Sequence, residues 1–234
     1  MRTTWYISLF LILLIILPLS ASQKIEWKVG NYWEYNLHYY MPQTNTQKIL
    51  MRVINEENIS VNGIIYESLV VEIKVNNLTK KILYYEKENL TIIKEIEYDG
   101  KKEEILSLPI ISFLPIYEGK KWNFTRDNIS ISFQCVGKEK AVTKAGKFDC
   151  YKIRIIYDWT NNNYTAAKFY QLVYFSEEVG NIVKAEGFFN EAPLFSEELI
   201  SYNYRNNSTI DMVFLNPLSF LIGVAEILYL LKKA

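Results

Sequence analysis

Short segments in which apolar and polar residues alternate recur from residue 33 to residue 204, and they constrain the fold more than any other feature. Successive side chains of a strand point to opposite faces of a sheet, so this period of two is typical of half-buried strands. No long segment before residue 205 has the 3.6-residue period of an amphipathic helix. The alternating segments are residues 33–39, 68–75, 90–98, 129–135, 151–157, 169–175, 182–189 and 198–204.

Turn residues separate these segments. Asn76-Asn77 and Asp99-Gly100 are pairs that favour tight turns between strands. The segment from Leu106 to Tyr117 is apolar but holds Pro109 and Pro115, so it cannot be a central strand and is predicted to be a connection. We therefore predict a mainly β protein, built as a single antiparallel curved sheet or as a half-barrel or sandwich.

The two ends of the chain differ from this middle part. Residues 1–22 combine Arg2, an apolar run over residues 7–19 and the small residues Ser20-Ala21-Ser22, which is the pattern of a secretory signal peptide. A retained N-terminal anchor is the alternative, although 13 apolar residues are few for a membrane span. We predict a signal peptide at 1–22, a β-rich extracytoplasmic domain at 23–205, a linker at 206–211, a transmembrane helix at 212–231 and a cytoplasmic tail at 232–234.

The C-terminal segment 212–231 is long enough to cross a bilayer as one helix. Twelve of its 20 residues are Leu, Ile, Val or Phe, and Lys232 and Lys233 follow it, which places the C-terminus in the cytoplasm. Glu226 is an ionisable group within the span, which either pairs with a helix of a membrane partner or extends toward the lipid head groups. A C-terminal amphipathic helix packed on the domain is the alternative to a span.

Asn-X-Ser/Thr sequons are unusually frequent between the two ends. They are candidate sites of N-glycosylation, which the export route permits. The alternative is that Asn and Thr are common in turns. The eight sites are Asn58, Asn77, Asn89, Asn123, Asn128, Asn163, Asn206 and Asn207.

Charge and residue usage argue against several classes of function. The 26 basic and 26 acidic residues balance, and no basic block occurs, so we expect no nucleic-acid partner. His38 is the only histidine and falls on the polar face of its strand, so we predict no catalytic triad, no metal site and no cofactor. A hydrolase that uses two carboxylates stays open, because the sequence offers many Glu pairs.

Cys135 and Cys150 are the only cysteines and form a candidate disulfide, since an exported domain meets an oxidising environment. The strand pattern opposes the pairing. Cys135 shares the apolar face of its strand, whereas Cys150 lies opposite Tyr151 and Ile153. A bulge near Gly137 is needed to bring the two into register.

Four motifs occur in a fixed order, and they are Gly30–Tyr35, Leu114–Trp122, Val142–Ile153 and Tyr174–Val183. In this order they resemble a broad class of exported bacterial and archaeal proteins of unknown function. These proteins are similar to the LolA/LolB type, a curved antiparallel sheet that wraps a helix or an apolar ligand. The resemblance covers about residues 27–190 and implies a fold and an exported location, without catalytic residues. It departs at Lys144, where that class usually has proline.

The motif residues also have a purely structural interpretation, in which Gly30, Gly119, Gly146 and Gly180 form turns and Trp33, Trp122 and Phe148 fill a core. We therefore expect a non-catalytic, membrane-anchored surface glycoprotein that binds an apolar ligand or a membrane partner. The alternatives are a structural or adhesive envelope protein without a ligand pocket, and a carboxylate-dependent surface hydrolase.

Overall fold

The computed structural model describes residues 25–41, 43–88, 90, 92–98, 103–104, 116–126, 129–159 and 169–204. These residues form strands, and no helix occurs among them. The strands are β1 (Tyr32–Tyr39), β2 (Asn45–Val61), β3 (Ile64–Val75), β4 (Leu78–Glu86), β5 (Ile92–Glu97), β6 (Glu103–Glu104), β7 (Lys121–Arg126), β8 (Ile129–Thr143), β9 (Gly146–Trp159), β10 (Phe169–Ser176), β11 (Asn181–Phe189) and β12 (Ala192–Asn203).

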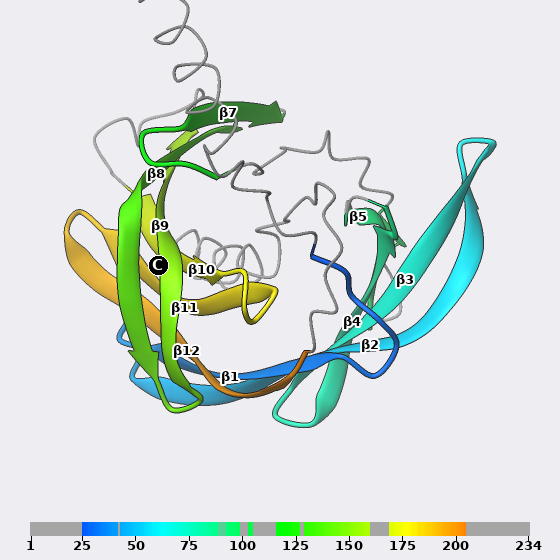
Figure 1. Ribbon diagram of the computed structural model, residues 1–234, viewed down its shortest axis with the longest axis horizontal. Coiled ribbons are helices and arrows are strands. Elements are labelled where there is room, and N and C mark those ends of the chain that lie inside the picture. Colours follow the sequence, from blue (N-terminus) through cyan, green and yellow to red (C-terminus); the bar gives the residue numbers. More distant parts are fainter. Residues whose placement is uncertain are drawn as a thin grey trace, which may run out of the picture.

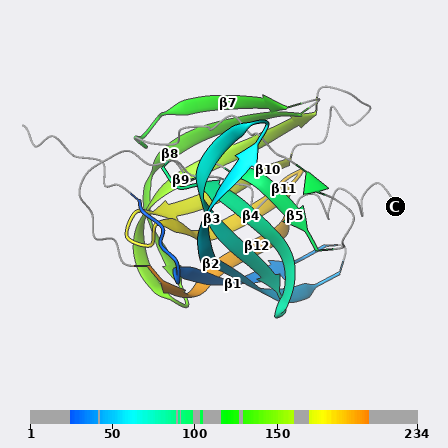
Figure 2. The same cartoon turned by 90° about the vertical axis from the view of Figure 1, so that its right-hand side faces the viewer.

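All twelve strands belong to one antiparallel sheet, in the order β6-β5-β4-β3-β2-β1-β12-β11-β10-β9-β8-β7. Figure 1 shows that the sheet is strongly curved, with β1 and β12 as its floor and the arms β3–β5 and β7–β9 rising on opposite sides. Figure 1 also shows the β2–β3 hairpin projecting from the rest of the sheet, and in Figure 2 this hairpin faces the viewer. The prediction of a mainly β protein with a single curved antiparallel sheet is confirmed.

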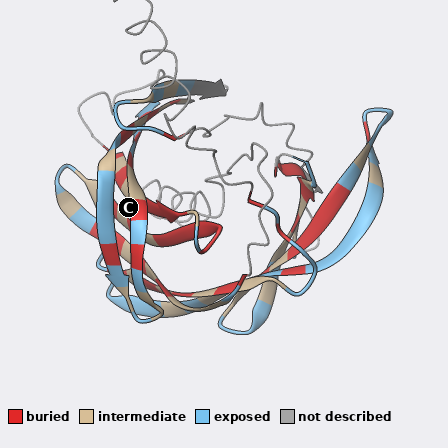
Figure 3. Ribbon diagram, in the orientation of Figure 1, coloured by how far each residue is buried: buried red, intermediate tan, exposed pale blue. Residues whose placement is uncertain are grey.

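Burial follows the alternation expected from the sequence. In β1 the side chains at positions 33, 35, 37 and 39 are buried and the intervening ones are half-buried. Figure 3 shows buried residues along the strands that line the curve and along part of β3, whereas the outer part of β2 is exposed. The hydrophobic core therefore lies on the concave face of the sheet.

Bulges interrupt the register at several points and increase the local twist of the sheet. Register shifts lie between Glu34 and Tyr35 in β1, between Tyr174 and Phe175 in β10, and between Cys135 and Gly137 in β8. These positions lie in the floor of the sheet and in one arm, where the strands must bend. A sheet of twelve strands can therefore curl around its apolar face.

The segment that precedes β1 lies across the concave face. Its Trp27 packs against Trp33 of β1, with ring centroids 4.8 Å apart, and against Tyr85 of β4 at 5.1 Å. The Trp27 indole also donates a hydrogen bond of 3.0 Å to the carbonyl oxygen of Gly180, in the β10–β11 turn. One side chain thus links strand β4 to a turn that lies several strands away in the sheet.

Cys135 and Cys150 are both buried and both free, so the predicted disulfide is wrong. Cys135 pairs with Ile153 across the β8–β9 hairpin, whereas Cys150 pairs with Glu139. Three residues of β9 therefore separate Cys150 from the position opposite Cys135, which is roughly 10 Å along the strand. A bulge does occur beside Gly137, as expected, but it does not bring the two cysteines opposite one another.

The predicted signal peptide, the linker and the transmembrane segment with Glu226 lie outside the described residues, as does most of the connection from Leu106 to Tyr117. A search of the described part of the chain finds no helix with the length and apolar character that a membrane crossing requires. The anchoring of the chain in a membrane stays a prediction from the sequence.

Candidate functional site

Two neighbouring rows of buried side chains cross the concave face from β1 toward β8. Each row is almost entirely apolar and contains one polar residue, which is Glu197 in the first row and Gln171 in the second. The first row is Leu37, Glu197, Ala185, Val173, Ile153 and Cys135, and the second is Tyr39, Phe195, Gly187, Gln171, Ile155 and Phe133. We refer to Glu197, Gln171 and the neighbouring Tyr35 as the polar cluster.

Gln171 lies in the middle of strand β10 with no exposed surface. Its register partners are Ile155 on β9 and Gly187 on β11, and Phe169 and Val173 flank it on the same face of its own strand. The amide nitrogen and the amide oxygen are both buried, and neither has a hydrogen-bond partner among the described residues. Burying an amide without partners costs about 1–3 kcal/mol in proteins, so this side chain is unfavourable for stability.

Glu197 lies in β12 between Leu37 and Ala185, and only 8 % of it is exposed. Burial raises the pKa of its carboxyl from the ordinary value of 4.5 to about 8. Near neutral pH the group is therefore mainly a carboxylic acid, which can both donate and accept a hydrogen bond. A polar group of this kind within an apolar face is a candidate functional residue.

Tyr35 lies next to Glu197 on the concave face. Its hydroxyl donates a hydrogen bond of 3.1 Å to the carbonyl oxygen of Ile182. Burial raises the pKa of Tyr35 well above its ordinary value, and the nearby Glu197 adds to this rise. The phenol therefore stays protonated and gives the polar cluster a third uncharged hydrogen-bonding group.

Strand β11 separates Glu197 from Gln171 with the two small residues Ala185 and Gly187. A methyl group placed on Gly187 would lie 2.1 Å from the ring of Phe195, so this ring rests directly on the glycine. Two strand spacings and two residues along the strand place the α-carbons of Glu197 and Gln171 about 12 Å apart. The polar side chains therefore extend from the same face on either side of a strand with small side chains.

A second polar group lies on the β4–β5 arm, where Lys81 contacts both Glu95 and Glu97. The Lys81 and Glu95 side chains are only 15 % and 9 % exposed. Burial lowers the pKa of Lys81, but hydrogen bonds to the two carboxylates outweigh this effect and raise it overall. Burial, aided by the charge of Glu95, also raises the pKa of the nearby Tyr85. These charges compensate one another, so this group has a structural explanation that the polar cluster lacks.

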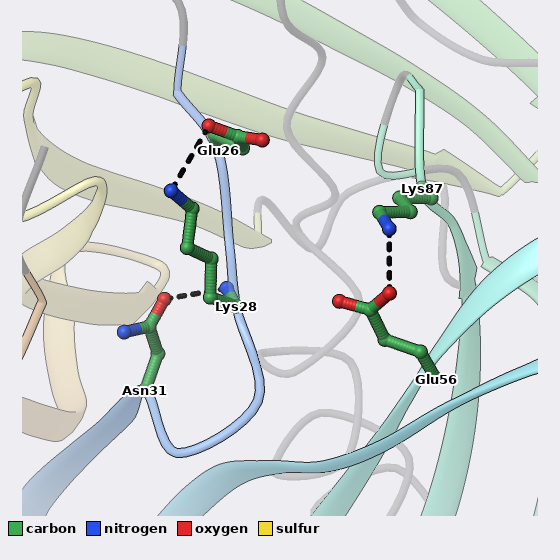
Figure 4. Close-up of polar contacts among 5 residues, drawn as sticks. All are labelled: Glu26, Lys28, Asn31, Glu56 and Lys87. Atoms are coloured by element: carbon green, nitrogen blue, oxygen red, sulfur yellow. Dashed lines mark hydrogen bonds and ion pairs between the residues drawn. The ribbon is translucent and has the colours of Figure 1, made fainter. Parts of the chain in front are cut away.

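Other ion pairs near the start of β1 are half exposed (Figure 4). Lys28 lies 3.5 Å from Glu26, and its backbone N–H donates a hydrogen bond of 2.7 Å to the side chain of Asn31. Lys87 donates a hydrogen bond of 2.5 Å to Glu56, which raises the pKa of the lysine. Exposed pairs of this type contribute little to stability, and they mark a solvated surface.

His38 and the candidate glycosylation sites singled out in the sequence lie apart from the polar cluster wherever the structure describes them. His38 shares a hydrogen bond of 2.8 Å with Thr46 at the surface. No group of three metal-ligating side chains occurs among the residues that the structure describes. Of the candidate glycosylation sites, Asn58, Asn77 and Asn123 are exposed, and the other five lie outside the described residues.

Most motif residues have the structural roles expected from the sequence, although Trp122 is only half-buried and packs against the core. Gly180 has a φ of 65° in the β10–β11 turn, and the other three motif glycines also have positive φ. Trp33 is fully buried, and its indole donates a hydrogen bond of 2.9 Å to the carbonyl oxygen of Val179. The motifs thus reflect turns and core packing.

The sequence analysis did not identify the polar cluster. Its signal in the sequence is a polar residue at an inward position of an alternating strand.

No family model and no curated protein matches the sequence. Among solved structures, a protein from Bacteroides fragilis described as exported with a YmcC-like fold is 13% identical, with a TM-score of 0.44 over 78% of this chain and 99% of that chain. A protein from Parabacteroides distasonis described as a lipoprotein is 14% identical, with a TM-score of 0.42 over 79% and 100%. The hypothetical lipoprotein YmcC from Escherichia coli is 13% identical, with a TM-score of 0.37 over 85% and 94%. Similarity at this level assigns no activity or ligand to this chain.

Proposed function

We propose that this chain is a non-catalytic surface protein, exported and held at the membrane, whose concave sheet face binds an apolar ligand. The observation that carries the proposal is Gln171, a fully buried amide with no hydrogen-bond partner among the described residues. Buried polar groups are almost always paired in native proteins, so an unpaired one needs an explanation. A ligand that reaches this face and satisfies the amide provides one.

The surroundings of Gln171 define the kind of ligand. Its register neighbours Ile155 and Gly187, and the rows beyond them, present apolar and aromatic side chains. Binding sites for small molecules are typically apolar surfaces with a few placed polar groups. The export signal, the sequons and the C-terminal apolar segment belong to the same proposal and place this face outside the cell.

Two alternatives make different predictions. A structural or adhesive protein would have a filled concave face, and Trp27 and Trp33 do fill the end of this face nearest the β10–β11 turn. A hydrolase of this type would need two carboxyl groups on either side of the scissile bond, one as an acid and the other as a base or nucleophile. Burial accounts for the raised pKa of Glu197 without a second carboxylate, so the polar cluster favours binding over this chemistry.

Tryptophan fluorescence tests the proposal directly, because Trp27 and Trp33 lie on the concave face. The full-length chain, held in an amphiphilic polymer in place of detergent, is titrated with a dibrominated long-chain lipid, whose bromine atoms quench nearby indoles. Saturable quenching with a defined stoichiometry is expected. Quenching that rises linearly without saturation, as for partition into the polymer, would refute the proposal.

A further inference from the structure

The chemistry of Gln171 specifies what a ligand must offer at this point. A glutamine amide has one acceptor oxygen and two N–H donors. Both ends are buried and lack partners among the described residues. A ligand group that only accepts hydrogen bonds, such as an ester carbonyl, would satisfy the nitrogen and leave the oxygen unpaired. The matching group both donates and accepts.

Glu197 has a similar hydrogen-bonding capacity on the other side of β11. Near neutral pH its carboxyl carries a proton, because burial raises its pKa to about 8. The protonated carboxyl can therefore both donate and accept a hydrogen bond, as the amide of Gln171 can. The residues beside it in its row, Leu37 and Ala185, offer no polar side chain to meet either one.

The two polar residues are arranged so that one small group can reach both. They extend from the same face on either side of β11, whose side chains at this point are the methyl group of Ala185 and the hydrogen of Gly187. The Phe195 ring covers Gly187, which leaves the position over Ala185, directly beside Glu197 and diagonal to Gln171, as the one between the two polar side chains. Their α-carbons lie about 12 Å apart, a span that two long side chains and a small head group fill.

A charged head group fits this position poorly. The rows around Glu197 and Gln171 are apolar, and a carboxylate or an ammonium group placed there would lose its hydration. A carboxylate would also have no cation to pair with in either row. An ammonium group would have to ionise Glu197, and burying such an ion pair usually gains little.

We propose that the ligand of the concave face is a lipid with one uncharged head group that both donates and accepts hydrogen bonds, as the hydroxyls of a monoacylglycerol do, and that this head group binds between Gln171 and Glu197. The inference rests on the proposed function and adds the chemical class of the ligand and the residues that select it.

Head-group selection is measured with the same quenching assay at pH 7. Three probes carry the same dibrominated saturated 18-carbon chain and differ in the head group, which is that of a monoacylglycerol, a free fatty acid or a primary amine. The full-length chain is expected to bind the monoacylglycerol at least about tenfold more tightly than the other two, because each charged head group loses hydration that the site does not replace.

The variant Gln171→Met keeps the length of the side chain and removes the amide that would donate and accept hydrogen bonds with the ligand. It is expected to weaken monoacylglycerol binding about tenfold or more. The ligand-free variant should be at least as stable as the original chain, because an unpaired buried amide is lost. A thermal unfolding curve therefore shows that weaker binding is not caused by unfolding. The matched control is Gln134→Met. Gln134 is a half-buried glutamine of β8 that faces away from the concave side of the sheet, so this change should leave binding unchanged.

The outcomes separate the two proposals. Saturable binding of all three probes with equal affinity, or monoacylglycerol binding that is unchanged in Gln171→Met, would overturn the head-group inference and leave the proposed function standing. Tighter binding of the amine or of the fatty acid would overturn the inference as well. Absence of saturable quenching with every probe would refute the proposed function itself, and this inference with it.

Discussion

Replacing Glu197 by glutamine should change how the stability of this protein depends on pH. In the folded chain the Glu197 carboxyl has a pKa of about 8, raised from 4.5 by burial. Between these two values the folded state holds a proton that the unfolded chain releases. Stability therefore falls as pH rises through this window. The penalty is absent below pH 4.5, grows up to about pH 8 and is constant above it.

The size of the effect follows from the width of the window. Each pH unit inside it costs about 1.4 kcal/mol, so the full penalty approaches roughly 5 kcal/mol. Between pH 5.5 and pH 7.5 the original chain should lose roughly 2–3 kcal/mol relative to Glu197→Gln, which carries no titrating proton. For a domain of this size that corresponds to a relative change of about 5–10 °C in melting temperature.

Thermal unfolding of the two full-length chains, followed by circular dichroism at several pH values, measures this difference. Relative to that of the original chain, the melting temperature of Glu197→Gln should rise between pH 5.5 and pH 7.5. Glu178→Gln, at an exposed position in the β10–β11 turn, is the control and should track the original chain. A difference in melting temperature between Glu197→Gln and the original chain that stays constant across this pH range would refute the assignment of a buried, protonated Glu197.

Three further predictions concern the packing around the site. Gly187→Ala places a methyl group against the Phe195 ring and should destabilise the fold by about 1–3 kcal/mol in chemical denaturation; no change would mean that the ring does not rest on the glycine. Lys81→Met leaves Glu95 buried without its cation and should cost about 3 kcal/mol, whereas Lys140→Met at a fully solvated ion pair should have no measurable effect; equal effects would contradict the burial of the Lys81 group. Without reductant, both buried thiols should stay silent toward a thiol reagent in the native protein and react after unfolding, and the absence of reactive thiols in denaturant would restore the disulfide.

Strands that lie across the core could be located from the sequence because one of their faces is buried. The alternation of residues 33–39 corresponds to β1, and that of residues 182–189 falls within β11. The apolar positions of residues 69–75 likewise face the core in β3, apart from Val75, which is half-buried at the strand end. A half-buried sheet imposes a period of two on its residues, and that constraint is local enough to be seen in a single chain.

Strand β2 shows where this approach fails. Beyond Val53 most of its side chains are exposed, because this part belongs to the projecting β2–β3 hairpin. The β2 side chains there do not alternate between a buried and an exposed face. The order of the strands and the curl of the sheet also depend on contacts between distant residues, such as the one between Trp27 and Gly180. Such contacts leave no local pattern in the sequence.

The candidate site was hidden for a different reason. Gln171 and Glu197 occupy inward positions, and a polar residue there looks like an interruption of the pattern rather than a feature of it. The candidate disulfide does not form because the bulge at Val136 shifts the register without bringing Cys135 opposite Cys150. Both errors concern single residues whose meaning depends on their partners across the sheet.

Native mass spectrometry of the full-length chain, purified from the cells that make it, tests most directly whether the concave face carries an apolar ligand. The proposed function predicts a discrete added mass in the range of a lipid, bound in a fixed ratio and removed by organic solvent. The head-group inference further predicts that this mass belongs to an uncharged lipid and is lost from Gln171→Met. A spectrum that shows only the chain, with or without glycans and with no ligand bound, would contradict the proposed function.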